Sequence, residues 1–398
     1  MTESLDQVRF VEVADVHKAG ERAARLVRVP GEGVLFSYEA DYVERADARA
    51  IAHTLPLDTA PFISPGGTVP AFFAGLLPEG RRLTVLRDAV KTSLDDELTL
   101  LLAVGADVPG DVQIVPHGEL PQDPPARVAD DLAAIDFLEL ADQVDLHGIP
   151  GVQEKLSAEM ISTPIASSSG RYILKLDPVD FPHLVANEHL HLIGARSLKL
   201  PVSRAQTIHD SIGRPGLLVQ RFDRVRAGDE GWRRLALEDA TQVLGLPPAD
   251  KYRVDASDAV LALSALCSAP VVAARNLYIQ FLFAWLTGNG DLHAKNVSAL
   301  TAEDGRTSVA PIYDIPCTLL YGDDSLALPV AGRTRNLKRA HWAQFAREIG
   351  LPERAAASAS AVALRAAVAI DLGLLPFRGS PLNEARRQLK FRRAEITG

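Results

Sequence analysis

Short alternating segments dominate the first third of the chain, and long apolar segments of helical pattern dominate the last third. Alternation of apolar and polar side chains is typical of strands that bury one face. Such segments occur at 8–13, 24–29, 34–38 and 110–115. The Pro-Gly-Glu-Gly turn at 30–33 predicts that the second and third form a hairpin. Helical patterns are expected at 72–77 and over about 81–105.

The pattern changes after residues 116–125, a proline-rich segment with few large apolar residues that we interpret as a linker. A short helix and a glycine turn at 148–155 are expected next. Strands at 171–176 and 216–222 flank a predicted helix at 185–195. Beyond 223 the chain is predicted to be mostly helical, and the apolar tract 277–286 indicates a buried helix.

Candidate chemistry lies near the junction of the strand-rich and helix-rich parts. Asp291 and Asn296 have the D-x-x-x-x-N spacing of a protein-kinase catalytic loop, in which the Asp accepts a proton and the Asn binds a metal ion. Asp314 follows an aromatic residue eighteen positions after Asn296, where a kinase places its second metal-binding residue. Lys175 on a predicted strand would neutralise phosphate charge, and Glu188 on the following helix could pair with it.

Each of these residues also has a simpler structural interpretation. Lys175 alone fits a surface lysine on a strand, and Glu188 fits a solvated helix position. Asn296 and Asp314 fit helix or turn caps. Their order along the chain favours the functional interpretation. His293 lacks a second histidine at helical spacing, so a role in packing or facing the nucleotide is favoured over metal ligation.

Composition and charge narrow the function. The 398 residues are 47% apolar and 23% charged, with a formal net charge of −9, which argues against broad, autonomous nucleic-acid binding. No run of 18 uninterrupted apolar residues indicates a membrane span, and the N-terminus lacks the pattern of a secretion signal. Two cysteines cannot build a disulfide framework or a zinc site by themselves. We therefore expect a cytoplasmic protein that does not enter a membrane.

Two groups of charged or polar residues are expected at the surface. The segment 386–393 holds five cations in eight positions, which fits a solvated helix end or a partner-facing surface, with an auxiliary phosphate contact as the alternative. The cluster His183, His189 and His191 has poor metal-ligand spacing, which favours a surface position. No G-x-S-x-G nucleophile elbow, Walker P-loop or clean G-x-G-x-x-G is present.

Eight segments of the chain form an ordered set of motifs. They are FFAGLLPEG at 72–80, LLAVGADVPG at 101–110, GVQEK at 151–155, YILKL at 172–176, ANE at 186–188, VQRFD at 219–223, DLHAKN at 291–296 and PIYD at 311–314. In this order they resemble the HipA family of serine/threonine protein kinases, the toxins of bacterial toxin–antitoxin modules, and the resemblance runs nearly from end to end.

This resemblance implies a divergent two-lobed protein-kinase-like fold of the α+β class. It implies a HipA-type accessory domain at 1–125, a kinase N-lobe at 126–222 and a helical kinase C-lobe at 223–398. It also implies ATP and Mg²⁺ as cofactors, with Asp291 as the catalytic base and Asn296 and Asp314 as the metal ligands. The residues expected to bind the nucleotide are Pro150, Gly151, Val152, Gln153, Glu154, Lys155, Lys175, Gln220, Arg221, Phe222, His293, Ala294, Lys295, Asn296, Tyr313 and Asp314.

The partners implied by the resemblance are a HipB-like helix-turn-helix antitoxin and a protein substrate, in the best-known branch an aminoacyl-tRNA synthetase. DNA would be met mainly through the antitoxin. The chain departs from the family at three positions: Gly148 stands where a regulatory serine is common, Gln220 replaces an acidic residue, and Leu292 replaces a glycine. Two alternatives remain open at this point: a nucleotide-binding pseudokinase that acts as co-repressor, and a kinase for a small molecule or lipid.

Overall fold

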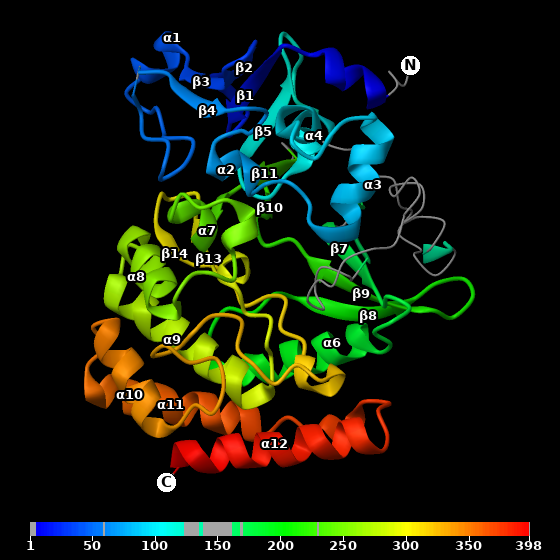
Figure 1. The fold of residues 1–398 in the computed structure, drawn as a ribbon, viewed down its shortest axis with the longest axis vertical. Helices are drawn as coiled ribbons and strands as arrows, with labels where there is room; N and C mark the ends of the chain where they lie inside the picture. Colours follow the sequence, from blue (N-terminus) through cyan, green and yellow to red (C-terminus); the bar gives the residue numbers. More distant parts are fainter. Residues whose placement is uncertain are drawn as a thin grey trace.

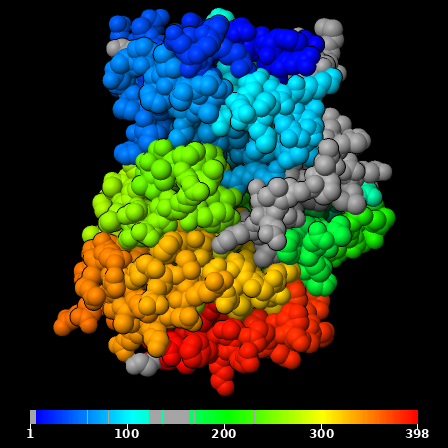
Figure 2. All heavy atoms as spheres, viewed as in Figure 1, coloured from blue at the N-terminus to red at the C-terminus, as the bar shows by residue number. Residues whose placement is uncertain are grey.

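The protein's structure is a computed structural model that describes residues 5–58, 60–122, 135–137, 161–167, 170–228 and 231–397. The N-terminal sheet lies at one end of the long axis of the molecule, and the last helix, α12, lies across the other (Figure 1). Figure 2 shows the same two ends on the surface, with the blue N-terminal segments opposite the orange and red C-terminal helices.

The N-terminal unit is an antiparallel sheet of strand order β4-β3-β2-β1-β5, packed against short helices. Its core holds Leu26, Phe73 and Leu101, all fully buried. The elements are η1 (Leu5–Phe10), β1 (Val13–Lys18), β2 (Glu21–Val29), β3 (Gly33–Tyr38), α1 (Ala40–Val43), β4 (Phe62–Pro65), α2 (Ala71–Ala74), α3 (Gly80–Val90), α4 (Glu97–Val104), η2 (Gly105–Asp107) and β5 (Val112–Pro116).

The predicted hairpin between β2 and β3 is confirmed, and glycine is required at its turn. Gly33 has a φ of 136°, and a Cβ atom there would lie 1.9 Å from the carbonyl oxygen of Ser64. The strand predicted at 8–13 is wrong, because residues Leu5–Phe10 form a 3-10 helix and the strand begins at Val13. The apolar residues Val8 and Val11 pack against the core from this helix and its exit, so their spacing was mistaken for a strand pattern.

A second antiparallel sheet, of order β6-β7-β9-β8, follows the linker. One face packs around Phe137 with Leu174, Leu176 and Leu218, and α6 contacts β7, β8 and β9. The elements are β6 (Ile161–Ala166), β7 (Arg171–Leu176), α6 (Leu184–Ala195), η5 (Arg196–Leu198), β8 (Ala205–His209) and β9 (Pro215–Gln220).

The remainder is built on α9, which is buried on all sides from Leu277 to Thr287, so the buried helix predicted at 277–286 is confirmed. Two small sheets, β10-β11 and β12-β13-β14, interrupt the part that was expected to be mostly helical. The elements are β10 (Arg224–Arg226), β11 (Trp232–Arg234), β12 (Ala236–Asp239), α7 (Ala240–Val243), η7 (Pro248–Asp250), α8 (Ala256–Leu266), α9 (Pro270–Thr287), η8 (Ala294–Asn296), β13 (Ser298–Thr301), β14 (Thr307–Val309), η9 (Thr318–Tyr321), α10 (Arg339–Glu348), α11 (Glu353–Val368), η10 (Leu372–Leu374) and α12 (Ser380–Thr397).

One segment of the described chain, Glu353–Leu374, is long and apolar enough to span a membrane. In the structure α11 packs along α9 and buries Ala359, Ala363 and Ala367 completely. It is therefore a core helix whose alanines allow close approach to its neighbour.

Candidate active site

Lys175 lies on β7, a central strand of the second sheet, between two leucines that bury the opposite face. Leu174 and Leu176 are 1% and 2% exposed, so the strand alternation turns the Lys175 side chain away from the Phe137 cluster. Its ammonium lies 2.8 Å from Oε1 of Glu188 on α6 and 2.9 Å from Oδ1 of Asp314. The expected pairing of Lys175 with Glu188 is present, and the surface interpretation of both residues does not hold.

The two carboxylates of this triad stabilise the buried Lys175 ammonium between them. Burial alone would lower the pKa of the Lys175 ammonium, but the carboxylates of Asp314 and Glu188 outweigh it and hold that pKa above its ordinary value. Burial raises the pKa of the fully buried Glu188 carboxyl, and the neighbouring Lys175 opposes that rise. Lys175 therefore stays cationic at physiological pH.

Asn187 connects the helix that carries Glu188 to the segment that follows Asp314. Its side-chain Nδ2 donates to the carbonyl of Cys317 over 3.0 Å, and its Oδ1 accepts from the Cys317 amide over 2.9 Å. A buried side chain that satisfies both backbone groups of one residue fixes the distance between the two segments. Asn187 thereby holds α6 against the loop that presents Asp314.

Asp291 lies in the turn after α9 and is fully buried. The helix ends at Gly288, whose φ of 76° turns the chain, and the Asp291 amide donates to Oδ1 of Asn289 over 2.8 Å. Nδ2 of Asn296 donates to the Asp291 carbonyl over 2.8 Å, which closes the turn. The hydroxyl of Tyr252 donates to Oδ1 of Asp291 over 3.1 Å and so orients its carboxylate.

The Asp314 turn lies directly against this loop. Tyr313 donates its hydroxyl to the carbonyl of Lys295 over 2.7 Å and lies 2.6 Å from Oγ of Ser298. Burial raises the Tyr313 pKa, so the hydroxyl remains a donor. Asp314 itself has a φ of 54°, an uncommon conformation for a residue with a side chain, and this bend directs its carboxylate to Lys175.

His293 is 3% exposed and packs edge-on against the Tyr252 ring, with the ring centroids 5.1 Å apart. Burial, followed by the charge of Lys251, lowers the His293 pKa to about 3. The imidazole is therefore neutral at physiological pH, and its Nδ1 accepts from the Lys295 amide over 3.2 Å. Leu292, at the position where the family has glycine, is 2% exposed and belongs to the main core, so the substitution is accommodated by packing.

The hinge residues at the end of β9 meet the N-terminal unit. Arg221 binds Asp107 at 2.9 Å and Asp223 at 3.0 Å, and Arg224 and Arg234 reach the same Asp107 oxygen at 3.0 and 3.1 Å. The three guanidinium groups outweigh the burial that would raise the Asp107 pKa, and lower it. Next to this cluster, the Phe222 and Tyr313 rings lie 5.5 Å apart and tilted by 41°.

The basic C-terminal segment is only partly solvated, which corrects the expectation of a surface. Arg392 is 4% exposed and donates to the carbonyls of Trp285, over 3.1 Å, and Asp324, over 2.7 Å. Arg393 donates to the Leu286 carbonyl over 3.2 Å. Cations at the carbonyl end of a helix are favourable. These two arginines therefore fix the end of α9, just before the turn that holds Asp291.

The histidine cluster is also partly misassigned. His191 is fully buried in α6, with Nδ1 2.8 Å from the Asn187 carbonyl. His183 and His189 are half-buried. His191 is buried because α6 lies between the second sheet and α11, so the expectation of a surface position is wrong for this residue.

The structure brings together Lys175, Asp291, Asn296, Asp314 and the hinge. The glycine turn Gly148 to Lys155, with its candidates Pro150, Gly151, Val152, Gln153, Glu154 and Lys155, lies outside the described residues. Among the described residues no group of three or more His, Cys, Asp and Glu side chains could hold a metal ion alone. Asn296 and Asp314 offer hard oxygen donors, which suit Mg²⁺ when phosphate oxygens complete its shell.

Three residues that position the site were not assigned that role from sequence. Asn289 and Tyr252 contact Asp291 directly, and Asn187 stands beside Glu188 in the ANE motif. The motif was a usable signal for Asn187. Tyr252 is 39 positions from Asp291, and no local pattern marked it.

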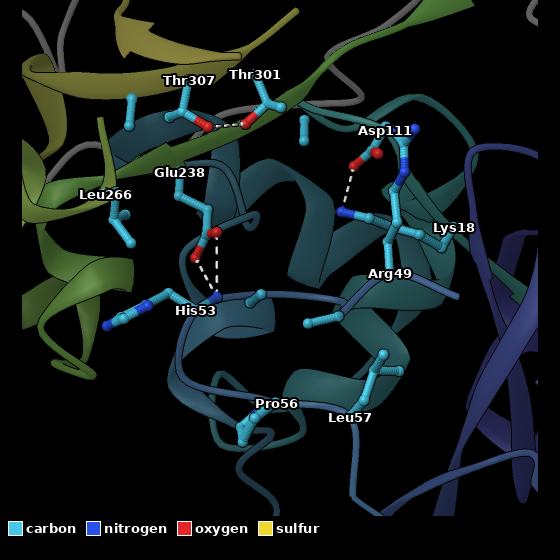
Figure 3. A pocket seen from close by; sticks show the side chains of 14 residues that line it. Lys18, Arg49, His53, Pro56, Leu57, Asp111, Glu238, Leu266, Thr301 and Thr307 are labelled. Atoms are coloured by element: carbon cyan, nitrogen blue, oxygen red, sulfur yellow. Dashed lines mark hydrogen bonds and ion pairs between the residues drawn. The ribbon is translucent and has the colours of Figure 1, made fainter. Parts of the chain in front are cut away.

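A pocket of about 450 Å³ lies elsewhere, between the N-terminal unit and the sheet β12-β13-β14 (Figure 3). Both carboxylate oxygens of Glu238 accept from the His53 amide, and Lys18 binds Asp111 at 2.8 Å across from it. The hydroxyls of Thr301 and Thr307 lie 2.9 Å apart on the same sheet as Glu238, at the same side of the pocket. Among the candidate site residues that the structure describes, none lines this pocket.

Comparison with known proteins shows which family has this sequence and fold. The model of the HipA-like C-terminal domain matches residues 147–370, which is more than half of the chain, and the model of the HipA N-terminal domain matches residues 14–115. The chain belongs to the HipA family. Its relatives include the protein Y4mE of Sinorhizobium fredii, 30% identical over 80% of this chain and 81% of that protein.

A second HipA-family relative is the serine/threonine-protein kinase toxin HipA of Shewanella oneidensis, 28% identical over 71% of this chain and 70% of that protein. A solved structure of the Shewanella oneidensis toxin–antitoxin system, with HipA, HipB and operator DNA, matches with a TM-score of 0.76 and 22% identity and covers 96% of each chain. The expected α+β fold, a two-lobed kinase-like architecture with a strand-rich N-terminal accessory domain and a mostly helical C-lobe, is confirmed.

Proposed function

We propose that this HipA-family chain is a serine/threonine protein kinase that uses ATP and Mg²⁺ and acts as the toxin of a toxin–antitoxin module. The observation that carries the proposal is the Lys175 ammonium, held between Glu188 and Asp314 beside the turn that contains Asp291 and Asn296. Phosphoryl transfer depends on positioning and charge stabilisation, and these residues supply both.

Each residue has a proposed task in the reaction. Lys175 binds phosphate oxygens of ATP, and Glu188 orients it. The amide nitrogen of Asn296 is engaged with the Asp291 carbonyl, so its amide oxygen, together with the Asp314 carboxylate, is proposed to hold the cation. Bound Mg²⁺ supplies neutralisation of the charge on the triphosphate. Asp291 accepts the proton of the attacking hydroxyl at Oδ2. Its other carboxylate oxygen, Oδ1, is held by the hydroxyl of Tyr252.

The nucleotide base is proposed to lie at the hinge, against main-chain groups of Gln220 and Phe222, with Arg221 holding the hinge in place through Asp107. The Asp291 and Asp314 turns form one wall of the proposed nucleotide site, which also includes His293, Ala294, Lys295 and Tyr313. The residues from Pro150 to Lys155 are proposed to cover the phosphates, as their resemblance to the family's phosphate loop implies. The proposed domain limits are 1–125, 126–222 and 223–398.

The proposed target is a protein of the translation machinery, of the aminoacyl-tRNA synthetase kind, whose phosphorylation would arrest growth in the cytoplasm. The proposed partner is a HipB-like helix-turn-helix antitoxin, through which the chain meets DNA. The match to a HipA solved with HipB and operator DNA supports this partner, and so does the net charge of −9, which disfavours direct DNA binding.

The test is phosphoproteomics after induced expression, with the wild type compared with Asp291→Asn. We expect a small set of serine or threonine sites that gain phosphate in the wild type only, together with arrested growth. Equal phosphorylation in the two strains would overturn the role of Asp291. Phosphate found only on a small molecule or a lipid would overturn the protein-kinase proposal.

One observation favours a second candidate, a nucleotide-binding pseudokinase that acts as co-repressor with the antitoxin. Asp314 is bound to Lys175 at 2.9 Å, and this contact engages a carboxylate oxygen that a metal ion would use. A rise in melting temperature with ATP, but without any ATP turnover at long incubation, would favour the pseudokinase.

A further inference from the structure

Glu79 connects the N-terminal unit to the two segments that build the Asp291 turn. It is the penultimate residue of the motif FFAGLLPEG at 72–80, to which the phosphoryl-transfer scheme gives no task. Its Oε1 lies 3.0 Å from Nζ of Lys295, inside the turn, and its Oε2 binds Nζ of Lys251. The side chains of Lys251 and Lys295 are only 12% and 13% exposed, so both pairs are shielded from solvent.

From Lys251 the connection reaches Asp291 in two short steps. The carbonyl of Lys251 accepts the amide of Ala294 over 3.1 Å, which anchors the middle of the turn. The next residue, Tyr252, donates its hydroxyl to Oδ1 of Asp291. The position of the 251–252 backbone therefore sets both the position of the Asp291 turn and the direction of the Asp291 carboxylate.

A second contact from the same motif holds Lys295 itself. Nζ of Lys295 donates to the carbonyl of Gly75 over 2.9 Å, and Nε2 of Gln242 donates to the carbonyl of Phe72 over 2.9 Å. A Cβ atom on Gly75 would lie 2.7 Å from Cγ of Gln242, so the motif approaches the C-lobe as closely as glycine allows. The accessory domain is thus packed directly against the wall of the proposed active site.

We propose that Glu79 is a positioning residue of the kinase reaction, through which the accessory domain holds the Asp291 turn in its productive geometry. This inference rests on the proposed function. Glu79 acts on Asp291 through Lys251, Tyr252 and the turn, and without its carboxylate the two lysines lose the anion that fixes them. Small displacements of a catalytic group are costly, since about 1 Å can reduce a rate roughly 100-fold.

Glu79 remains charged under all physiological conditions. Burial would raise the pKa of its carboxyl, but Lys295 and Lys251 outweigh that effect and lower the pKa to about 2. The connection is consequently a permanent part of the fold and does not respond to pH near neutrality.

The test compares the full-length wild type with Glu79→Gln and Lys251→Met, and Glu44→Gln at an exposed position of the same unit serves as the control. Steady-state phosphotransfer is measured with Mg-ATP, and hydrogen–deuterium exchange is measured on the peptide that covers 291–297. For Glu79→Gln we expect kcat to fall about 10-fold or more, with KM for ATP within about twofold of wild type. We also expect about 10-fold faster exchange in that peptide.

The double variant Glu79→Gln/Lys251→Met should lose little more than either single variant, because both act through one connection. The inference is overturned if the folded variants keep wild-type kcat and wild-type exchange at 291–297. It is also overturned if KM for ATP rises while kcat stays constant. If Glu79→Gln does not fold, the same two measurements, kcat and exchange at 291–297, are made on Lys251→Met. This variant leaves the accessory domain intact, and the same results support or overturn the inference.

The exchange measurement separates this inference from the proposed function. If the wild type transfers no phosphate, yet Glu79→Gln accelerates exchange at 291–297, the kinase proposal fails and the structural role of Glu79 stands. If the wild type is active and both readouts are unchanged in Glu79→Gln, the kinase proposal stands and the inference fails.

Discussion

The Lys175 ammonium lies 2.9 Å from Oδ1 of Asp314, although 139 positions separate the two residues in the sequence. This contact joins a strand of the second sheet to a turn of the helical part, and Glu188 completes the triad from α6. The proposed phosphate site depends on this triad. Lys175 supplies the cation, the buried Glu188 carboxylate fixes its position, and Asp314 supplies a second carboxylate.

Replacing Lys175 with Met should weaken binding of Mg-ATP by about 10- to 100-fold, because a charge-assisted contact to phosphate is worth roughly 1.5–3 kcal/mol. Isothermal titration calorimetry of the purified protein measures this change. Lys390→Met, at an exposed position on α12, is the matched control and should bind as the wild type does. Unchanged affinity in Lys175→Met would contradict the assignment of this lysine to the phosphates.

Local patterns predicted the hairpin β2-β3, the strand β7 and the helices α6 and α9, because each has a regular period or a diagnostic turn. The candidate residues Lys175, Glu188, Asp291, Asn296 and Asp314 were also found from sequence, through their spacing and order. The pairing of Lys175 with Glu188 was expected, but the contact of Lys175 with Asp314 was not, since it joins elements 139 positions apart in the sequence.

Other features escaped prediction for physical reasons. The spacing of Val8 and Val11 fits both a strand and a 3-10 helix. Packing against the N-terminal core therefore decides which of the two this segment forms. The cations of α12 looked like a solvated group, but Arg392 and Arg393 are drawn inward by the carbonyls at the end of α9. Tyr252 has no local signature, and the motif at 72–80 contains Glu79 without indicating its task, because both residues act through partners supplied by tertiary structure.

Replacing Arg392 with Ala should lower the free energy of unfolding by about 2–4 kcal/mol. The change removes hydrogen bonds to the buried carbonyl of Trp285 and the partly buried carbonyl of Asp324, and a guanidinium that lies 3.8 Å from the centre of the Trp285 ring. Arg387→Ala, an exposed neighbour paired with Glu384, should cost less than about 1 kcal/mol. Denaturant unfolding of both variants gives the comparison, and equal losses would argue against a role for Arg392 in fixing α9.

Acid should destabilise the protein partly through His191. Burial lowers the pKa of this imidazole to about 4 from an ordinary value of 6.5. The unfolded chain therefore binds the proton more readily, and the contribution to stability declines as pH falls from about 6.5 to about 4. Between pH 7 and pH 5 the loss from this group is about 2 kcal/mol.

The variant His191→Gln removes the titrating group, so its unfolding free energy should fall about 2 kcal/mol less than that of the wild type between those two pH values. Its stability at pH 7 provides the reference for the substitution itself. An identical pH dependence in the two proteins would show that His191 is not the buried neutral group described here.

Replacing Asp107 with Asn should destabilise the contact between the N-terminal unit and the hinge by about 3–5 kcal/mol. The change leaves Arg221, Arg224 and Arg234 without the carboxylate that they share. Glu303→Gln, which breaks the exposed pair with Arg233, should cost at most about 1 kcal/mol. Chemical unfolding measures both. A loss no larger in Asp107→Asn than in Glu303→Gln would be incompatible with a buried charge cluster at this contact.

The most direct measurement of the central claim is transfer of the γ-phosphoryl group of ATP to serine or threonine of protein in a bacterial lysate, by the purified chain with Mg²⁺. We predict transfer by the wild type, a rate lower by about 10²–10⁴-fold in Asp291→Asn, and a wild-type rate in Asp304→Asn at an exposed turn. Absence of transfer by the wild type, or an equal rate in Asp291→Asn, would contradict the account.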